Sequence, residues 1–177
     1  TDIVTLTMPC FGTTDRTRDN ATKLGELLGT TFRRVDIGEA VMQHFADIGH
    51  DPSDHSTTYE NCQARERTQV LMDIANKNGG LVIGTGDLSE LALGWCTYNG
   101  DHMSMYAVNC SIPKTLVRHL THYVSDLNRE SNPELSAVLD DVLATPVSPE
   151  LLPTTEDGQM THFTEDLVGP YELHDFF

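Results

Sequence analysis

The sequence of 177 residues predicts an α/β fold in which a parallel β-sheet is flanked by helices. Two observations support this: short β-branched or apolar segments alternate with longer segments of helical periodicity, and glycines stand where the helices should end. The length suits about one domain with a sizeable core. Hydrophobic residues make up 38% of the chain, which excludes a low-hydrophobicity disordered polymer. No apolar run approaches the roughly 20 residues of a membrane-spanning helix.

The first half of the chain carries the alternation most clearly. Residues 3–8 are apolar and β-branched and predict a short buried strand, which Pro9 and Gly12 end. Gly29, Gly49 and the Gly79–Gly80 pair then end three segments with apolar residues three or four apart. The expected order is strand 3–8, helix 20–28, strand 32–37, helix 41–48, loop 50–58, helix 59–77 and strand 81–83. This order is typical of a parallel sheet with helices on both faces.

Beyond residue 84 the pattern is less regular. We expect a short helix over 89–93, a second helix from Pro113 to about residue 124, and a third over 133–143. Prolines at 146, 149, 153 and 170 predict that the tail from Thr145 is mostly loop.

Charge is strongly negative and unevenly distributed. The formal net charge is −16; residues 130–177 hold 11 acids and no Lys or Arg, whereas residues 1–129 hold 16 acids and 11 bases. A charge of this sign argues against nucleic acid or an anionic membrane as a partner. The acidic shift can mark a domain edge, a solvated tail or a segment that another part of a protein completes.

Cysteine and histidine do not form a recognisable ligand motif. Cys10, Cys62, Cys96 and Cys110 are widely spaced and include no Cys-x-x-Cys pair. A zinc site or a disulfide stays an alternative, but we expect four reduced, mostly buried thiols and a cytoplasmic protein, since no export signal is visible. The pair His119 and His122 could share a helix face, yet surface histidines are the better interpretation.

Two glycine-containing segments follow predicted strands, where ligands bind in open α/β sheets. They are residues 10–14 and residues 84–87, and the second combines backbone access with the Thr85 hydroxyl. Glu90 follows in the first turn of a short helix. It is either an acid that stabilises the helix dipole or a Mg²⁺ ligand.

Three further features could contact a polar, partly aromatic ligand. Trp95 is either a core anchor or a stacking platform for a flat heterocycle, and the polar loop after it contains Tyr98 and Asp101. Lys114 begins a helix, a poor place for a cation, and so hints at a phosphate contact. Asn61 and Arg65, four apart on a helix, could grip a ligand together or belong to an exposed polar stripe.

Four motifs occur in order along the chain. They are Tyr59-Glu60-Asn61 with Gln63-Ala64-Arg65, then Gly84-Thr85-Gly86-Asp87-Leu88-Ser89-Glu90-Leu91-Ala92-Leu93-Gly94-Trp95, then Thr97-Tyr98-Asn99-Gly100-Asp101-His102-Met103-Ser104, and Pro113-Lys114-Thr115-Leu116-Val117. Together they resemble the synthetase domain of glutamine-dependent NAD synthetases, over nearly the whole chain. The resemblance implies a Rossmann-like adenine nucleotide α-hydrolase fold and a homo-oligomer.

The resemblance also implies a reaction and roles. In that family ATP adenylates the carboxylate of nicotinic acid adenine dinucleotide (deamido-NAD), and ammonia from a separate glutaminase domain then displaces AMP to give NAD⁺. Phosphate neutralisation and positioning carry such chemistry, so no catalytic nucleophile is expected. The implied contacts are Asn61, Arg65, Glu90, Trp95, Tyr98 and Asp101 for deamido-NAD, Thr85 and Lys114 for ATP, and Glu90 for Mg²⁺.

Three departures from the family pattern qualify this expectation. The pyrophosphate loop Ser-Gly-Gly-x-Asp-Ser is absent, and no nitrilase-like glutaminase domain is present. Tyr98 stands where the shorter ammonia-dependent relatives carry an active-site lysine, as expected for the glutamine-dependent branch. We therefore expect residues 1–177 to be a partial synthetase domain, inactive or nearly so alone, with 145–177 as a mobile acidic lid loop and a truncated end. The alternatives are another ATP pyrophosphatase of the same fold, such as a GMP synthetase, or a non-catalytic oligomerisation module.

Overall fold

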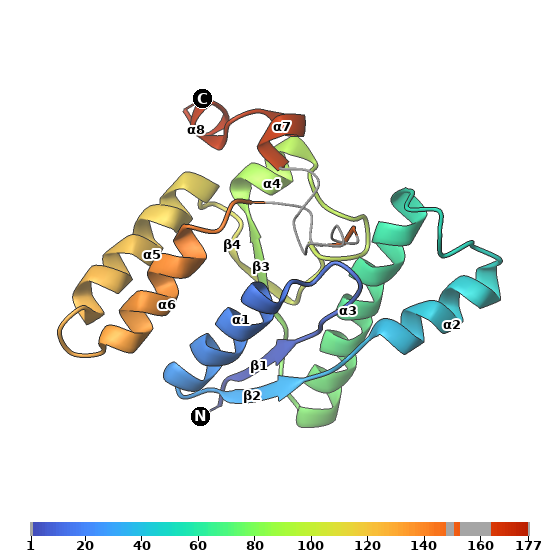
Figure 1. Ribbon diagram of the computed structural model, residues 1–177, viewed down its shortest axis with the longest axis horizontal. Coiled ribbons are helices and arrows are strands. Elements are labelled where there is room, and N and C mark those ends of the chain that lie inside the picture. The colour runs from blue at the N-terminus through green and yellow to red at the C-terminus, as the bar shows by residue number, and fades with distance from the viewer. Residues whose placement is uncertain (1, 148–150, 153–163, 177) are drawn as a thin grey trace. The chain divides into compact units, whose positions relative to one another are not determined.

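A computed structural model describes residues 2–147, 151–152 and 164–176. These residues contain two pairs of strands and eight helices (Figure 1). In chain order the elements are β1 Val4–Thr7, α1 Asp15–Leu27, β2 Thr31–Arg34, α2 Gly38–Ile48, α3 Thr57–Asn78, β3 Ile83–Asp87, α4 Leu88–Leu93, β4 Tyr106–Asn109, α5 Lys114–Asn128, α6 Pro133–Leu143, α7 Thr164–Val168 and α8 Tyr171–His174.

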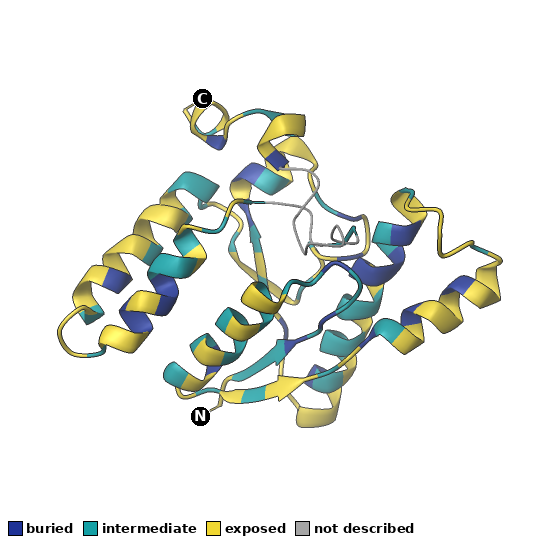
Figure 2. Ribbon diagram, viewed as in Figure 1, coloured by how far each residue is buried: buried dark blue, intermediate teal, exposed yellow. Residues whose placement is uncertain are grey.

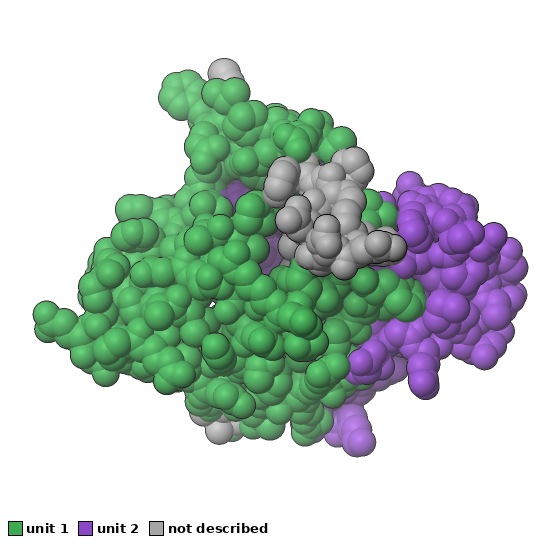
Figure 3. Space-filling model, viewed as in Figure 1, with its two compact units in different colours: residues 1–35, 115–177 green, residues 36–114 purple. Residues whose placement is uncertain are grey.

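The chain divides into two compact units (Figure 3). One unit combines Thr1–Val35 with Thr115–Phe177, and the other is the continuous segment Asp36–Lys114. Each unit contains one pair of parallel strands, β1 with β2 in the first and β3 with β4 in the second.

In the first unit, α1 packs against β1, β2 and α6. The helix begins after Thr14, whose hydroxyl oxygen accepts a hydrogen bond from the Thr17 amide at 3.2 Å. Gly25 is buried where α1 crosses the strands. A Cβ there would lie 2.6 Å from the Phe32 ring, so the close approach of helix and strand requires glycine.

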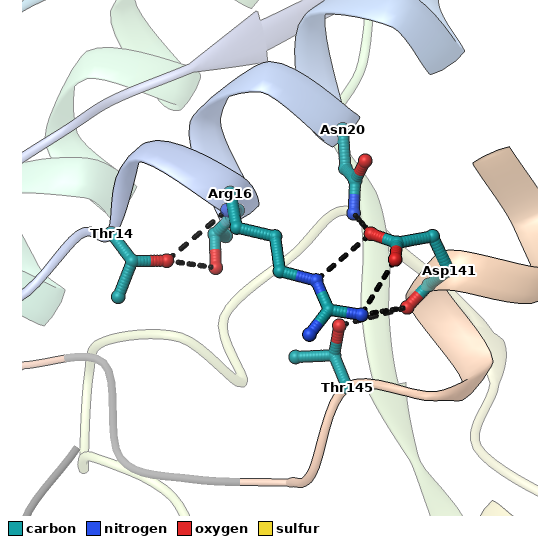
Figure 4. A network of polar contacts seen from close by, with 6 residues as sticks. Thr14, Arg16, Asn20, Asp141 and Thr145 are labelled. Atoms are coloured by element: carbon teal, nitrogen blue, oxygen red, sulfur yellow. Dashed lines mark hydrogen bonds and ion pairs between the residues drawn. The ribbon is translucent and has the colours of Figure 1, made fainter. Parts of the chain in front are cut away.

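A polar network joins α1 to α6 (Figure 4). Arg16 donates from Nε to Asp141 Oδ2 at 2.9 Å and from Nη2 to Oδ1 at 2.6 Å, and Asn20 Nδ2 adds a bond to Oδ2 at 2.6 Å. The hydrogen bonds from Arg16 and then Asn20 lower the pKa of Asp141 to about 2. Because the pair is bidentate, it fixes orientation as well as distance between the helices.

The helices α5 and α6 lie side by side and meet through buried hydroxyls (Figure 1). Ser125 is fully buried and bonds both Ser136 Oγ at 2.9 Å and Asp140 Oδ1 at 2.6 Å. Much of α5 carries exposed residues (Figure 2), and its exposed apolar side chains are Leu116, Leu120, Tyr123, Val124 and Leu127.

The second unit is organised around α3, the longest described helix. The helix α2 packs on it, and Phe45, with no exposed surface, stacks on Tyr59 with 5.3 Å between ring centroids. Gly49 and Gly79 end α2 and α3 with φ of 68° and 63°, as their positions in the sequence predict. The strand β3 pairs with β4 and leads directly into α4.

All six expected helices are present. The helix α6 has the expected bounds, whereas α1 begins at Asp15 instead of residue 20 and α5 ends at Asn128 instead of about residue 124. The strand predictions need three corrections. The second strand covers Thr31–Arg34, not 32–37. The third strand covers Ile83–Asp87, not 81–83, so the segment expected to be a loop belongs to β3, and β4 was not expected at all. The burial expected of strand 3–8 is also wrong in part, because Ile3 is more than half exposed and Thr7 is the one buried residue of β1.

The tail and the cysteines differ from expectation too. The tail contains the short helices α7 and α8, while residues 148–150 and 153–163 of the expected lid lie outside the described residues. The four cysteines are free as expected, but only Cys62 is buried. His119 and His122 are both exposed. Across the described part of the chain, every helix is too short or too polar to cross a membrane.

Candidate functional site

The junction of β3 and α4 is fixed by a reciprocal cap. Asp87 is the N-cap of α4: its Oδ1 accepts from the Glu90 amide at 3.0 Å, and Glu90 Oε2 accepts from the Asp87 amide at 3.3 Å. Each side chain satisfies a backbone donor that the first turn of a helix leaves unpaired. The cap therefore fixes the direction of the Glu90 carboxylate at the end of β3.

Lys114 completes a cluster with these two acids. Its Nζ lies 2.7 Å from Asp87 Oδ2 and 2.8 Å from Glu90 Oε1, and its backbone amide donates to Ser89 Oγ at 2.9 Å. The Asp87 and Lys114 side chains are 5% and 15% exposed, so the ion pair is largely withdrawn from water. A lysine at the first position of α5 opposes the helix dipole, and the two carboxylates compensate it.

The same contacts raise the pKa of Lys114 above its ordinary value of 10.5. Burial is the largest single influence and lowers this pKa, but the hydrogen bonds and charges of Asp87 and Glu90 together outweigh it. The lysine is therefore protonated at neutral pH. It is a fixed positive charge beside a partly exposed carboxylate.

A second cluster joins α3 to the loop over residues 95–102, with Thr97 at its centre. Thr97 Oγ1 donates to Asn61 Oδ1 at 2.8 Å, and the Thr97 amide donates to Asp101 Oδ1 at 2.7 Å. The Thr97 carbonyl accepts from His102 Nδ1 at 2.7 Å and from the Gly100 amide at 3.0 Å. Because the Asn61 oxygen accepts this bond, the group through which Asn61 can donate hydrogen bonds is its Nδ2 amide nitrogen.

Arg65 makes a second hydrogen bond between α3 and this loop. Its Nε donates to the Tyr98 carbonyl at 3.2 Å, one turn of helix beyond Asn61. The loop turns at Asn99, which has a φ of 53°. Gly100 packs so closely that a Cβ would lie 2.8 Å from Thr97 Cγ2. The loop is thus held at a defined distance from α3.

The aromatic side chains of the loop face solvent. Trp95 is 38% exposed and Tyr98 is 75% exposed, so neither is the core anchor that Trp95 could have been. Between them, burial raises the pKa of the Cys96 thiol, and the Asp101 and Glu90 carboxylates raise it further. The thiol is therefore protonated near neutral pH, which does not suit a cysteine nucleophile.

The residues expected to contact deamido-NAD, ATP or Mg²⁺ all lie in the Asp36–Lys114 unit, whereas the 10–14 segment lies in the other unit. The structure places Glu90 beside Lys114. It also joins α3 to the 95–102 loop, where Asn61 bonds the Thr97 hydroxyl and Arg65 bonds the Tyr98 carbonyl. Thr85 is exposed on β3, and among the described residues neither its side chain nor that of Trp95 takes part in the hydrogen bonds and ion pairs of the two clusters.

Sequence reasoning assigned no role to Asp87, Ser89, Thr97 or His102. The spacing of Asp87 and Glu90 is that of a capping box, which could have predicted their mutual bonds. Nothing in the local sequence predicts the Asn61–Thr97 bond, because it joins residues far apart in the chain.

Of the two described carboxylates in the Asp87–Glu90–Lys114 cluster, Glu90 is the one open to a metal ion. Its side chain is 29% exposed, while Asp87 is buried against Lys114. Within the described residues no group of three His, Cys, Asp or Glu side chains could hold a metal. Mg²⁺ is commonly held by one or two carboxylates together with substrate phosphates. The donor set therefore fits Mg²⁺ that a nucleotide brings with it.

Comparison with known proteins places the chain in a family. The family profile for NAD synthase matches residues 1–169, so the chain belongs to the NAD synthase family. Glutamine-dependent NAD(+) synthetases from Mycobacterium tuberculosis and Mycobacterium leprae are 46% and 44% identical to it over 180 residues. These matches cover 99% of the chain but only 26% of each relative.

Solved structures agree with this assignment. A glutamine-dependent NAD⁺ synthetase from Acinetobacter baumannii, determined with ADP, is 32% identical and gives a TM-score of 0.68 over 81% of this chain and 26% of that one. NMN synthetase from Francisella tularensis gives a TM-score of 0.78 over 98% of this chain and 65% of that one at 23% identity, a likeness of fold alone. The expected Rossmann-like adenine nucleotide α-hydrolase fold is confirmed.

Proposed function

We propose that the chain is part of an ATP-dependent ligase that amidates deamido-NAD to NAD⁺. The observation that carries the proposal is the pair of clusters in one unit: the α3–loop cluster around Thr97, and the Asp87–Glu90–Lys114 cluster at the end of β3. The first offers amide, guanidinium and aromatic groups to a dinucleotide. The second offers a fixed positive charge to a nucleotide phosphate and a carboxylate to the divalent cation that accompanies it.

The reaction has two steps. An oxygen of the deamido-NAD carboxylate attacks the α-phosphorus of ATP, the bond to the β-phosphate oxygen breaks, and pyrophosphate leaves. Ammonia then attacks the acyl carbon, AMP leaves with the carboxylate oxygen, and the nitrogen loses a proton to give the amide. Both steps require aligned reactants and neutralised phosphate charge rather than a protein nucleophile.

Each proposed contact has a chemical role. The Asn61 Nδ2 amide nitrogen and the Arg65 guanidinium bind polar groups of deamido-NAD, with Tyr98 and Asp101 beside them. Trp95 stacks on the nicotinic acid ring, which its exposure permits. Lys114 binds ATP phosphate and Thr85 hydrogen-bonds ATP. Glu90 would hold Mg²⁺ where the two ligands meet, and the metal would neutralise phosphate charge there.

The source of the ammonia and the oligomeric state are proposed on the family alone. Ammonia comes from glutamine through a separate glutaminase domain, and the enzyme is a homo-oligomer. The four free cysteines agree with a reducing, cytoplasmic location.

Production of NAD⁺ and pyrophosphate from ATP, Mg²⁺, deamido-NAD and ammonium tests the proposal. The assay is made with this chain and with a full-length protein that contains it, each as wild type and as Lys114→Ala. We expect the full-length protein to turn over and Lys114→Ala to reduce its rate at least about tenfold, with little or no turnover by the 177-residue chain alone. Lys77→Ala, at the exposed end of α3, is the matched control and should leave the rate unchanged.

If the full-length protein amidated nicotinate mononucleotide instead of deamido-NAD, the protein would be another ATP pyrophosphatase of this fold. The absence of any ligand binding or turnover by the full-length protein would favour a non-catalytic module.

A further inference from the structure

Asp87 is the member of the Asp87–Glu90–Lys114 cluster to which the proposed function gives no role. Its side chain is only 5% exposed, and it uses its two oxygens for different partners. Oδ1 accepts from the Glu90 amide at 3.0 Å, whereas Oδ2 lies 2.7 Å from Lys114 Nζ. Helix capping therefore accounts for one oxygen and leaves the second to the lysine.

We infer that Asp87 is a positioning residue that holds Lys114 beside Glu90 and keeps it there when Glu90 turns to a metal ion. The inference rests on the proposed function, since it concerns the nucleotide end of that site.

The geometry of the lysine supports this role. Lys114 is fixed at both ends: its backbone amide donates to Ser89 Oγ at 2.9 Å, and its ammonium lies between two carboxylates. A lysine paired with Glu90 alone would lose that partner whenever Mg²⁺ took the Glu90 oxygens. With Asp87 as a second anion 2.7 Å away, the ammonium stays in place during the exchange.

The charge of the cluster points the same way. Two carboxylates and one ammonium leave one net negative charge, which favours a divalent cation and repels a bare nucleotide. The structure thus couples nucleotide binding to the metal. Removing the Asp87 charge would make the cluster neutral and would leave Glu90 as the carboxylate facing Lys114, less available to Mg²⁺.

Asp87→Asn separates positioning from capping. Asparagine caps helices as well as aspartate does and can accept the same bond from the Glu90 amide. It cannot supply the negative charge that holds the ammonium. Asp73→Asn is the matched control, because Asp73 is an exposed acid in the same unit.

The first readout is the affinity for ADP, measured calorimetrically on the 177-residue chain with Mg²⁺ and with a chelator. We expect Asp87→Asn to reduce the ratio of Mg²⁺-supported to metal-free affinity about tenfold, with metal-free binding tightened, and Asp73→Asn to leave the ratio unchanged. An unchanged ratio in Asp87→Asn, at an unchanged melting temperature, would overturn the inference.

The second readout needs no nucleotide. The chain has three lysines, so limited acetylation followed by mass spectrometry compares Lys114 with the exposed Lys23 and Lys77 in one sample. We expect Asp87→Asn to accelerate acetylation of Lys114 several-fold relative to both references. An unchanged relative rate would contradict a holding role for Asp87.

If the wild-type chain binds no ADP under either condition, the nucleotide part of the proposed function fails, and the acetylation result still decides the role of Asp87.

Discussion

The hydrogen bond between Thr97 and Asn61 allows the most specific prediction about the α3–loop cluster around Thr97. Thr97→Val keeps the branched shape of the side chain and removes only the hydroxyl, so the Thr97 amide and carbonyl keep their bonds to Asp101 and His102. Thr97 is 9% exposed, and its bond to Asn61 is 2.8 Å long. A neutral bond of this kind contributes about 1 kcal/mol to the free energy of unfolding.

A double-mutant cycle isolates this contribution. Asn61→Ala alone also changes helix propensity in α3, but that effect cancels in the cycle with Thr97→Val. The coupling energy between the two sites should be about 1 kcal/mol, or about a fivefold difference in the folding equilibrium.

Urea unfolding followed by tryptophan fluorescence suits this measurement, because the only tryptophan, Trp95, lies in the same loop. A second cycle pairs Thr97→Val with Asn78→Ala, whose side chain bonds the Ile74 carbonyl within α3 at 2.7 Å. That pair should be additive within about 0.3–0.5 kcal/mol. A Thr97–Asn61 coupling below about 0.3 kcal/mol would refute the assignment of Thr97 as the centre of the cluster.

Three other changes test different contacts. Gly84→Ala places a Cβ 2.8 Å from the Ser104 Cβ and should destabilise the chain by about 1–3 kcal/mol in thermal unfolding, with partial recovery on adding Ser104→Gly. Lys114→Met leaves the buried Asp87 carboxylate without its cation and should lower the free energy of unfolding in urea by about 1–3 kcal/mol. Lys77→Met should lower it by less than about 0.5 kcal/mol, and equal losses in the two variants would contradict the buried ion pair. The pKa of Asp141 lies at about 2 instead of 3.8, so its stabilising effect is present above pH 3.8 and is lost as the pH falls through about 2. Asp141→Asn should therefore lower the melting temperature at neutral pH and flatten its acid dependence, and an unchanged acid profile would count against the Arg16 network.

Helices were the most predictable part of the fold. Apolar spacing and terminal glycines located the C-terminal ends of α2 and α3 to within one residue, because Gly49 and Gly79 adopt the left-handed conformation that the pattern indicates. The two helices begin three and two residues earlier than expected. Pro133 likewise marked the start of α6. These signals are local, so the sequence carries them without tertiary context.

The strands were less predictable because their pairing is not local. The strand β3 extends through Gly84 and Gly86, which disfavour strands, because Ile83 and Gly84 pair with Tyr106 and Ala107 of β4. A Cβ at Gly84 would meet Ser104, so the glycine that indicated a loop is instead required by the close approach of chain segments.

The site was predictable in its residue types but not in its contacts. The anomalous position of Lys114 at a helix start indicated a special role, and the structure accounts for it by the two carboxylates beside it. The role of Thr97 depends on a bond to α3 across 36 residues of sequence, which no local pattern contains.

The most direct test of the central claim is a titration of the chain with deamido-NAD, followed by Trp95 fluorescence. The proposed site predicts saturable quenching as the nicotinic acid ring stacks on the indole, with affinity at least about tenfold weaker in Arg65→Ala. Arg33→Ala, an exposed arginine of β2, should bind as the wild type does. No quenching by deamido-NAD, or equal affinity in Arg65→Ala and Arg33→Ala, would contradict a dinucleotide site on α3 and the 95–102 loop.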